Sequence, residues 1–102
     1  MNQAIEQINQ IEQARRNLLA QKQQFDGQLM EVETALRELE GANESYVIVG
    51  NIMVRKEKEK IKKDLQNKQE SLTLRRGQIE TQEKRLGEKS AQLRAALAEG
   101  KS

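Results

Sequence analysis

The chain has 102 residues, of which 35% are hydrophobic, 2% are aromatic and 33% are charged, and its net charge is +2. A chain this short and this polar cannot bury a large globular core, so most of its stability must come from helix contacts and from partner chains. It contains no cysteine and no histidine, which excludes disulfides, thiol nucleophiles, histidine acid–base chemistry and the usual zinc sites.

The composition favours long helices, because proline is absent while glutamine, glutamate, lysine, arginine, leucine and alanine are abundant. No apolar run approaches the length of a membrane span, and the first residues lead into a polar helical pattern rather than a signal peptide. We therefore expect a soluble, cytoplasmic protein.

Residues 1–40 are predicted to form the first long helix, with apolar residues at a spacing of seven. A second series with the same spacing, which we call the companion series, occupies the other core position of each heptad. It is apolar at both ends and basic in the middle, and two such series are typical of a coiled coil. The first series is Ala4, Ile11, Leu18, Phe25, Val32 and Leu39, and the companion series is Met1, Ile8, Arg15, Lys22, Leu29 and Leu36.

Residues 45–55 are predicted to form a β-hairpin, with Gly50 and Asn51 in a primed two-residue turn. Both faces of each strand carry apolar side chains, and a lone two-stranded hairpin is only marginally stable. We therefore expect it to pair with hairpins of other chains. The predicted oligomerisation residues are Tyr46, Val47, Ile48, Val49, Ile52, Met53 and Val54.

Residues 56–99 are predicted to form the second long helix, antiparallel to the first. Its apolar series is Leu65, Leu72, Ile79, Leu86 and Leu93, and its predicted companion series is Ile61, Lys68, Arg75, Gln82, Lys89 and Ala96. This arrangement gives five wholly apolar layers, beginning with Leu39 opposite Leu65, which alternate with weaker mixed layers. One mixed layer places Arg15 against Lys89. This layer predicts that the two helices pair less stably toward the chain ends.

Charge also favours pairing of the two helices, because residues 1–40 are net acidic and residues 55–102 are net basic. The lysine-rich run at residues 55–63 has two interpretations. Nucleic-acid binding is one, but Glu57 and Glu59 interrupt the run and no aromatic residues accompany it. A solvated helix face is the interpretation we favour.

The antiparallel arrangement brings the two chain ends together, so Met1, Ile5 and Ile8 are expected near Leu93 and Leu97, with Ala96 beside them. Such a small apolar set can bind other apolar chains weakly. Alternatively, these residues only close the ends of the two helices against each other.

The long helices and the single YVIVGNIMVR hairpin between them, with VGNIMV as its most recognisable part, resemble the β-type subunits of archaeal prefoldin. The α-type subunits of that family have two linked hairpins, whereas this chain has room for one. The resemblance implies a heterohexamer of two α-type and four β-type subunits, with hairpins in β-barrels and six projecting coiled coils. In that family the coiled-coil tips capture unfolded proteins without ATP and deliver them to a group II chaperonin.

Carried over to this chain, the resemblance implies a single domain at residues 1–102, with residues 1–40, 45–55 and 56–99 as its parts, and a chaperone that is not an enzyme. From the residues themselves we expect no cofactor, metal, nucleic-acid partner or membrane partner. A structural scaffold that binds no clients remains the alternative. The implied client contacts are Met1, Ile5, Ile8, Leu93 and Leu97, and the implied chaperonin contacts are Arg94 and Lys101.

Overall fold

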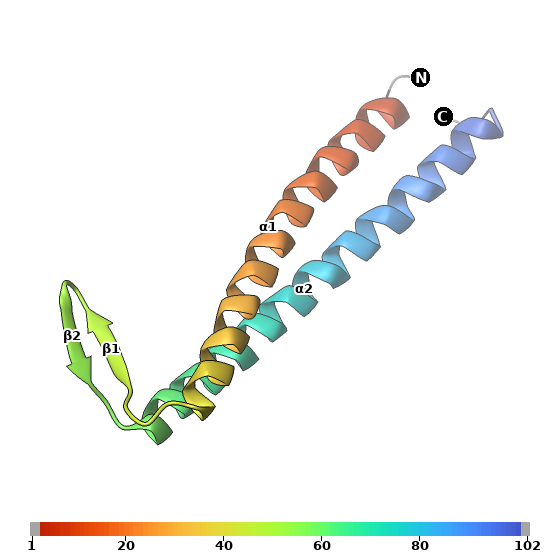
Figure 1. Ribbon diagram of the computed structural model, residues 1–102. Helices are drawn as coiled ribbons and strands as arrows, with labels where there is room; N and C mark the ends of the chain where they lie inside the picture. Colours follow the sequence, from red (N-terminus) through yellow and green to blue (C-terminus); the bar gives the residue numbers. More distant parts are fainter. Residues whose placement is uncertain (1–2, 101–102) are drawn as a thin grey trace. The chain divides into compact units, whose positions relative to one another are not determined.

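The computed structural model describes residues 3–100, which form two long helices with one two-stranded hairpin between them (Figure 1). In chain order the elements are α1 (Gln3–Glu40), β1 (Tyr46–Val49), β2 (Ile52–Arg55) and α2 (Lys58–Ala98). This confirms the predicted mainly α class with a single hairpin between two helices. The chain divides into two compact units, which we call the hairpin unit (residues 25–74) and the terminal unit (residues 3–24 and 75–100).

The heptad pattern predicted for α1 is present along the whole helix. Within residues 3–40, every member of both predicted series is buried or half-buried, from Ala4 to Leu39. Most of the positions between them are exposed. A stripe of this spacing leaves one side of the helix apolar, and that side packs against α2 in each unit.

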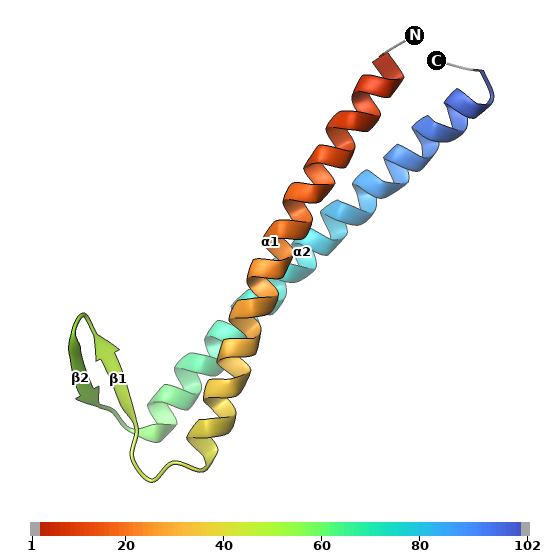
Figure 2. The same cartoon turned by 45° about the horizontal axis from the view of Figure 1, so that its top comes forward.

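In the hairpin unit, the end of α1 and the start of α2 run antiparallel beside each other (Figures 1 and 2), with Val32, Leu39 and Leu72 buried between them. A lysine on α2 also stabilises the end of α1. Lys58 Nζ donates to the carbonyl oxygens of Glu40 at 2.9 Å and Ala42 at 3.5 Å. The last carbonyls of a helix have no partner within the helix and carry partial negative charge, which a lysine offsets.

Two further lysines of the 55–63 run also have partners in the hairpin unit. Lys62 Nζ lies 3.2 Å from a carboxylate oxygen of Glu40, and Lys56 Nζ lies 2.9 Å from one of Asp64. Part of this lysine-rich run therefore joins α2 to the end of α1 rather than forming a free basic surface.

The hairpin pairs Tyr46 with Arg55 and Val49 with Ile52 in antiparallel register. Gly50 has a φ of 63°, and no residue other than glycine in the described part of the chain has a positive φ. Glycine in the left-handed region at the first central position is the signature of a type II′ turn. The predicted primed turn is therefore confirmed, with Gly50 supplying the conformation that side chains disfavour.

In the terminal unit, the start of α1 and the end of α2 also run antiparallel (Figure 2), and Ala4, Ile8, Ile11 and Ile79 are buried. Leu18 and Leu86 line one groove in this unit, and Leu39 and Leu65 line another in the hairpin unit. Both pairs agree with the predicted apolar layers.

The predicted companion series of α2 is wrong by one residue over most of its length. Of its members, Lys68, Arg75, Gln82 and Lys89 are exposed. The next residues along the chain are buried or half-buried instead, namely Gln69, Arg76, Glu83 and Ser90. A companion position lies three or four residues from each leucine, and both choices are polar here, so spacing alone does not distinguish them.

Candidate functional site

The hairpin exposes apolar side chains on both of its faces. Directly opposed residues share a face, so Val47, Val49, Ile52 and Val54 form one face. The other face combines Ile48 and Met53 with the more polar Tyr46 and Arg55. Ile48 is 73% exposed, Ile52 67% and Met53 66%. Contiguous apolar surface of this kind marks a site of protein contact.

Both edges of the hairpin also offer unpaired backbone groups. The Lys56 amide donates to the Ser45 carbonyl at 3.0 Å, and the Ser45 hydroxyl donates to the Lys56 carbonyl at 2.5 Å. Because hydrogen-bonded pairs alternate along an antiparallel ladder, the amides and carbonyls of Ile48 and Met53 point away from the hairpin. Each edge can therefore accept another strand.

The tip residues predicted from the sequence differ in accessibility. Ile5 is 48% exposed, whereas Ile8 is 8% exposed and faces α2. Leu93 and Leu97 are half-buried. Met1, the remaining predicted client contact, lies outside the described residues. Ile5 is therefore the most accessible of the four predicted client contacts that lie within the described residues.

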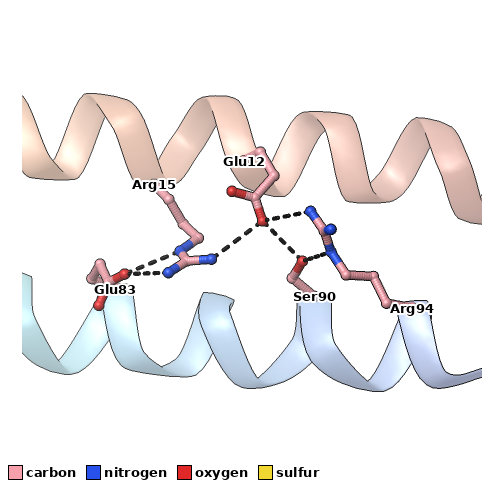
Figure 3. Close-up of polar contacts among 5 residues, drawn as sticks. All are labelled: Glu12, Arg15, Glu83, Ser90 and Arg94. Atoms are coloured by element: carbon pink, nitrogen blue, oxygen red, sulfur yellow. Dashed lines mark hydrogen bonds and ion pairs between the residues drawn. The ribbon is translucent and has the colours of Figure 1, made fainter.

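A polar cluster that sequence reasoning missed joins α1 to α2 in the terminal unit (Figure 3). One carboxylate oxygen of Glu12, Oε1, accepts from Ser90 Oγ at 2.9 Å, Arg15 Nη1 at 3.2 Å and Arg94 Nη2 at 3.4 Å. Arg94 Nε also donates to Ser90 Oγ at 3.2 Å. Ser90 is 1% exposed, so its hydrogen bond to Glu12 lies inside the interface between the two helices. We call Glu12, Arg15, Glu83, Ser90 and Arg94 the Glu12 cluster.

Arg15 connects the Glu12 cluster to a second carboxylate. Its Nη2 and Nε donate to Glu83 Oε1 at 2.8 Å and 3.0 Å. Gly87 lies beside this guanidinium, and a Cβ there would be 3.5 Å from the guanidinium carbon, an ordinary contact distance. The predicted layer of like charges, Arg15 against Lys89, is therefore wrong, since Arg15 faces Glu83 while Lys89 is exposed.

The cluster changes the acidity of two of its members. The hydrogen bond from Ser90 is the main cause that lowers the pKa of Glu12, and Arg15 and Arg94 lower it further. The hydrogen bonds to Glu83 are the main cause that raises the pKa of Arg15. Both shifts favour the charged forms that make the contacts between the helices.

Comparison with known proteins identifies the class to which this fold belongs. A family model described as "Prefoldin subunit" matches residues 2–100. The chain is 31% identical over 96 residues to "Prefoldin subunit beta" of Archaeoglobus fulgidus, covering 91% of this chain and 83% of that one. It is 36% identical over 90 residues to the protein of the same name from Thermococcus onnurineus, covering 85% and 78% of the two chains.

A solved structure agrees with these sequence matches. The crystal structure of the prefoldin β subunit from Thermococcus strain KS-1 superposes with a TM-score of 0.91 at 31% identity, covering 95% of this chain and 88% of that chain. The chain therefore belongs to the prefoldin subunit family, and the predicted resemblance to the β type is confirmed.

Members of this family are non-enzymatic chaperone subunits that assemble with other prefoldin subunits into hetero-oligomers. Within residues 3–100, no group of acidic side chains is arranged to hold a metal ion. Neither helix contains, in its described residues, an apolar stretch that could cross a bilayer.

Proposed function

We propose that this chain is the β-type subunit of an ATP-independent chaperone that captures unfolded proteins and passes them to a group II chaperonin. The assembly contains two α-type and four β-type subunits and acts in the cytoplasm. The observation that supports assembly most directly is the hairpin, whose apolar faces are exposed and whose strands pair only with each other within residues 3–100. The residues proposed to join subunits are Tyr46, Val47, Ile48, Val49, Ile52, Met53 and Val54.

The proposed client contacts lie at the ends of the two helices. Ile5 supplies the most exposed apolar surface among the four described contacts, and Leu93 and Leu97 on α2 are half-buried. Each such contact is weak alone. When the helix ends of several subunits bind one unfolded chain together, the combined affinity rises although each individual contact is unchanged. Arg94, whose side chain is 61% exposed, and Lys101, outside the described residues, are the proposed chaperonin contacts.

Native mass spectrometry of the tagged chain, purified from its source cells, tests the assembly. We expect four copies of this chain with two copies of a second helical subunit. A homodimer without a second subunit would contradict the proposal.

Client capture is tested separately, by the suppression of aggregation when a denatured test protein is diluted into buffer without ATP. We expect Ile5→Ser to weaken suppression, because it removes exposed apolar surface at the proposed contact. Gln7→Ser is the matched control, since Gln7 is exposed on the same helix. If the intact assembly does not suppress aggregation at all, the chain acts as a scaffold.

A further inference from the structure

The interface of the terminal unit contains a polar contact where a coiled coil usually places an apolar one. Ser90 occupies a core position of α2 and is 1% exposed, yet it contributes a hydroxyl rather than an apolar side chain. Its partner across the interface is the carboxylate of Glu12. The two helices are therefore joined here by hydrogen bonds rather than by apolar packing.

The ion pairs within the Glu12 cluster hold the two helices together only weakly. The side chains of Glu12, Arg15 and Arg94 are 27%, 35% and 61% exposed. Water can replace partners that are this accessible, and salt screens their charges. In contrast, separating Ile8 and Ile11 from α2 brings buried apolar surface into water. Contact between the two helices of this unit, which we call closure, thus depends on a few apolar residues and on the Glu12 cluster.

The Glu12 cluster lies directly beside the apolar residues that the closed interface hides. Ile8 and Ile11 are within one helical turn of Glu12, and Leu93 is three residues from Ser90. Ile8 and Ile11 are buried, and Leu93 is half-buried. Separation of the helices at the cluster would therefore expose these three side chains together.

We infer that the Glu12 cluster controls opening of the terminal unit, and that opening makes Ile8 and Leu93 accessible to clients and adds Ile11 to the surface that binds them. The second half of this inference rests on the proposed function. The cluster keeps the apolar residues covered when no client is present, which limits self-association. A client that binds the open form shifts the equilibrium toward it.

Opening is measured in the full-length chain with nitroxide labels on Asn9→Cys and Gln92→Cys. Both positions are exposed on opposite helices, and the chain has no other cysteine. Electron–electron resonance then gives the distribution of distances between the labels. Ser90→Ala should raise the open population about fivefold, the effect expected for one lost hydrogen bond. Glu12→Gln should raise it as well, because it removes the negative charge that faces Arg15 and Arg94. Glu6→Gln and Ser71→Ala are matched controls, because both residues are exposed on the same helices.

Client binding is measured on the same variants, as suppression of aggregation of the denatured test protein. We expect Ser90→Ala and Glu12→Gln to capture more client than their matched controls. Unchanged label distances in both variants would overturn the inference. So would wider distances without greater capture, because the exposed residues would then not bind clients. Failure of the proposed function appears differently, as no capture by the unsubstituted chain while the distances still report opening.

Discussion

Gly50 determines the turn of the hairpin through its backbone rather than through a side chain. Its φ of 63° lies in a region that side chains disfavour, and nothing within 4 Å restricts the space for a Cβ. Gly50→Ala should therefore destabilise the hairpin by about 1–2 kcal/mol through backbone strain alone. Thermal unfolding of the assembled protein measures this loss, and native mass spectrometry should show fewer intact assemblies.

Asn51 provides the control for this substitution, because it is the other central residue of the turn and its φ is not positive. Asn51→Ala should change stability by less than about 0.5 kcal/mol. Equal losses from the two substitutions would show that Gly50 does not carry the special conformation of a type II′ turn.

Glu12 gives the terminal unit a dependence on pH. Its pKa is lowered below 4.5 in the folded chain, chiefly by the hydrogen bond from Ser90. A lowered folded-state pKa means that the stabilisation is fully present above the unfolded value and is lost as the pH falls through the folded value. The difference in melting temperature between the unsubstituted chain and Glu12→Gln should therefore shrink as the pH falls below 4.5.

All carboxylates other than Glu12 are present in both proteins, so their contributions largely cancel in the difference. Glu6→Gln is the matched control, since Glu6 is an exposed glutamate on the same helix. A difference for Glu12→Gln that stays constant with pH would mean that the charge of Glu12 contributes nothing to closure.

At the scale of the element, α1 could be predicted from the sequence and α2 only in part. In α1 the companion positions include Ile8, Leu29 and Leu36, so one choice of register is clearly the more apolar. In α2 both choices are polar over most of the helix, as Lys89 and Ser90 illustrate. The choice is made by partners on α1, because Glu12 accepts from Ser90, and such partners become visible only once the two helices are placed together.

The Glu12 cluster could not be predicted for the same reason. Its five members are common residues of a charged helix surface, and they come from positions far apart in the sequence. The hairpin was predictable because its turn signal and its alternation are local. Arg15 shows the limit most clearly: its partner Glu83 follows from the helix register, which spacing alone left undecided.

Gly77 weakens α2 without contributing a contact that requires glycine. Apart from the adjacent backbone of its own helix, nothing lies within 4 Å of where its Cβ would be, and its φ is not in the positive range. Gly77→Ala should therefore stabilise the chain by about 1 kcal/mol, because alanine loses less backbone entropy in a helix. Urea unfolding followed by circular dichroism measures the gain.

Gly87→Ala tests the same gain in helix stability at a position where another side chain, Arg15, lies close by. Its Cβ would meet the Arg15 guanidinium at 3.5 Å, an ordinary contact distance, so a gain of similar sign is expected. Destabilisation by Gly77→Ala would mean that this glycine permits a helix distortion that the chain requires.

At the scale of the whole molecule, the two units differ in what joins their helices. In the hairpin unit Val32, Leu39 and Leu72 are buried in the interface, and Lys58 and Lys62 contact the end of α1. In the terminal unit Ala4, Ile8, Ile11 and Ile79 are buried as well, but the Glu12 cluster occupies part of the interface. Apolar burial is the larger stabilising effect, because partly exposed ion pairs contribute little.

Native-state hydrogen exchange should therefore divide α1 into two parts. Amides around Val32 should exchange more slowly than amides around Ile11, although both side chains are buried, because local opening requires less free energy in the terminal unit. The comparison uses a single helix of one molecule, so intrinsic differences between proteins do not enter. Protection that is equal at the two sites would mean that α1 opens as one cooperative unit, and the polar interface would then have no separate motion to control.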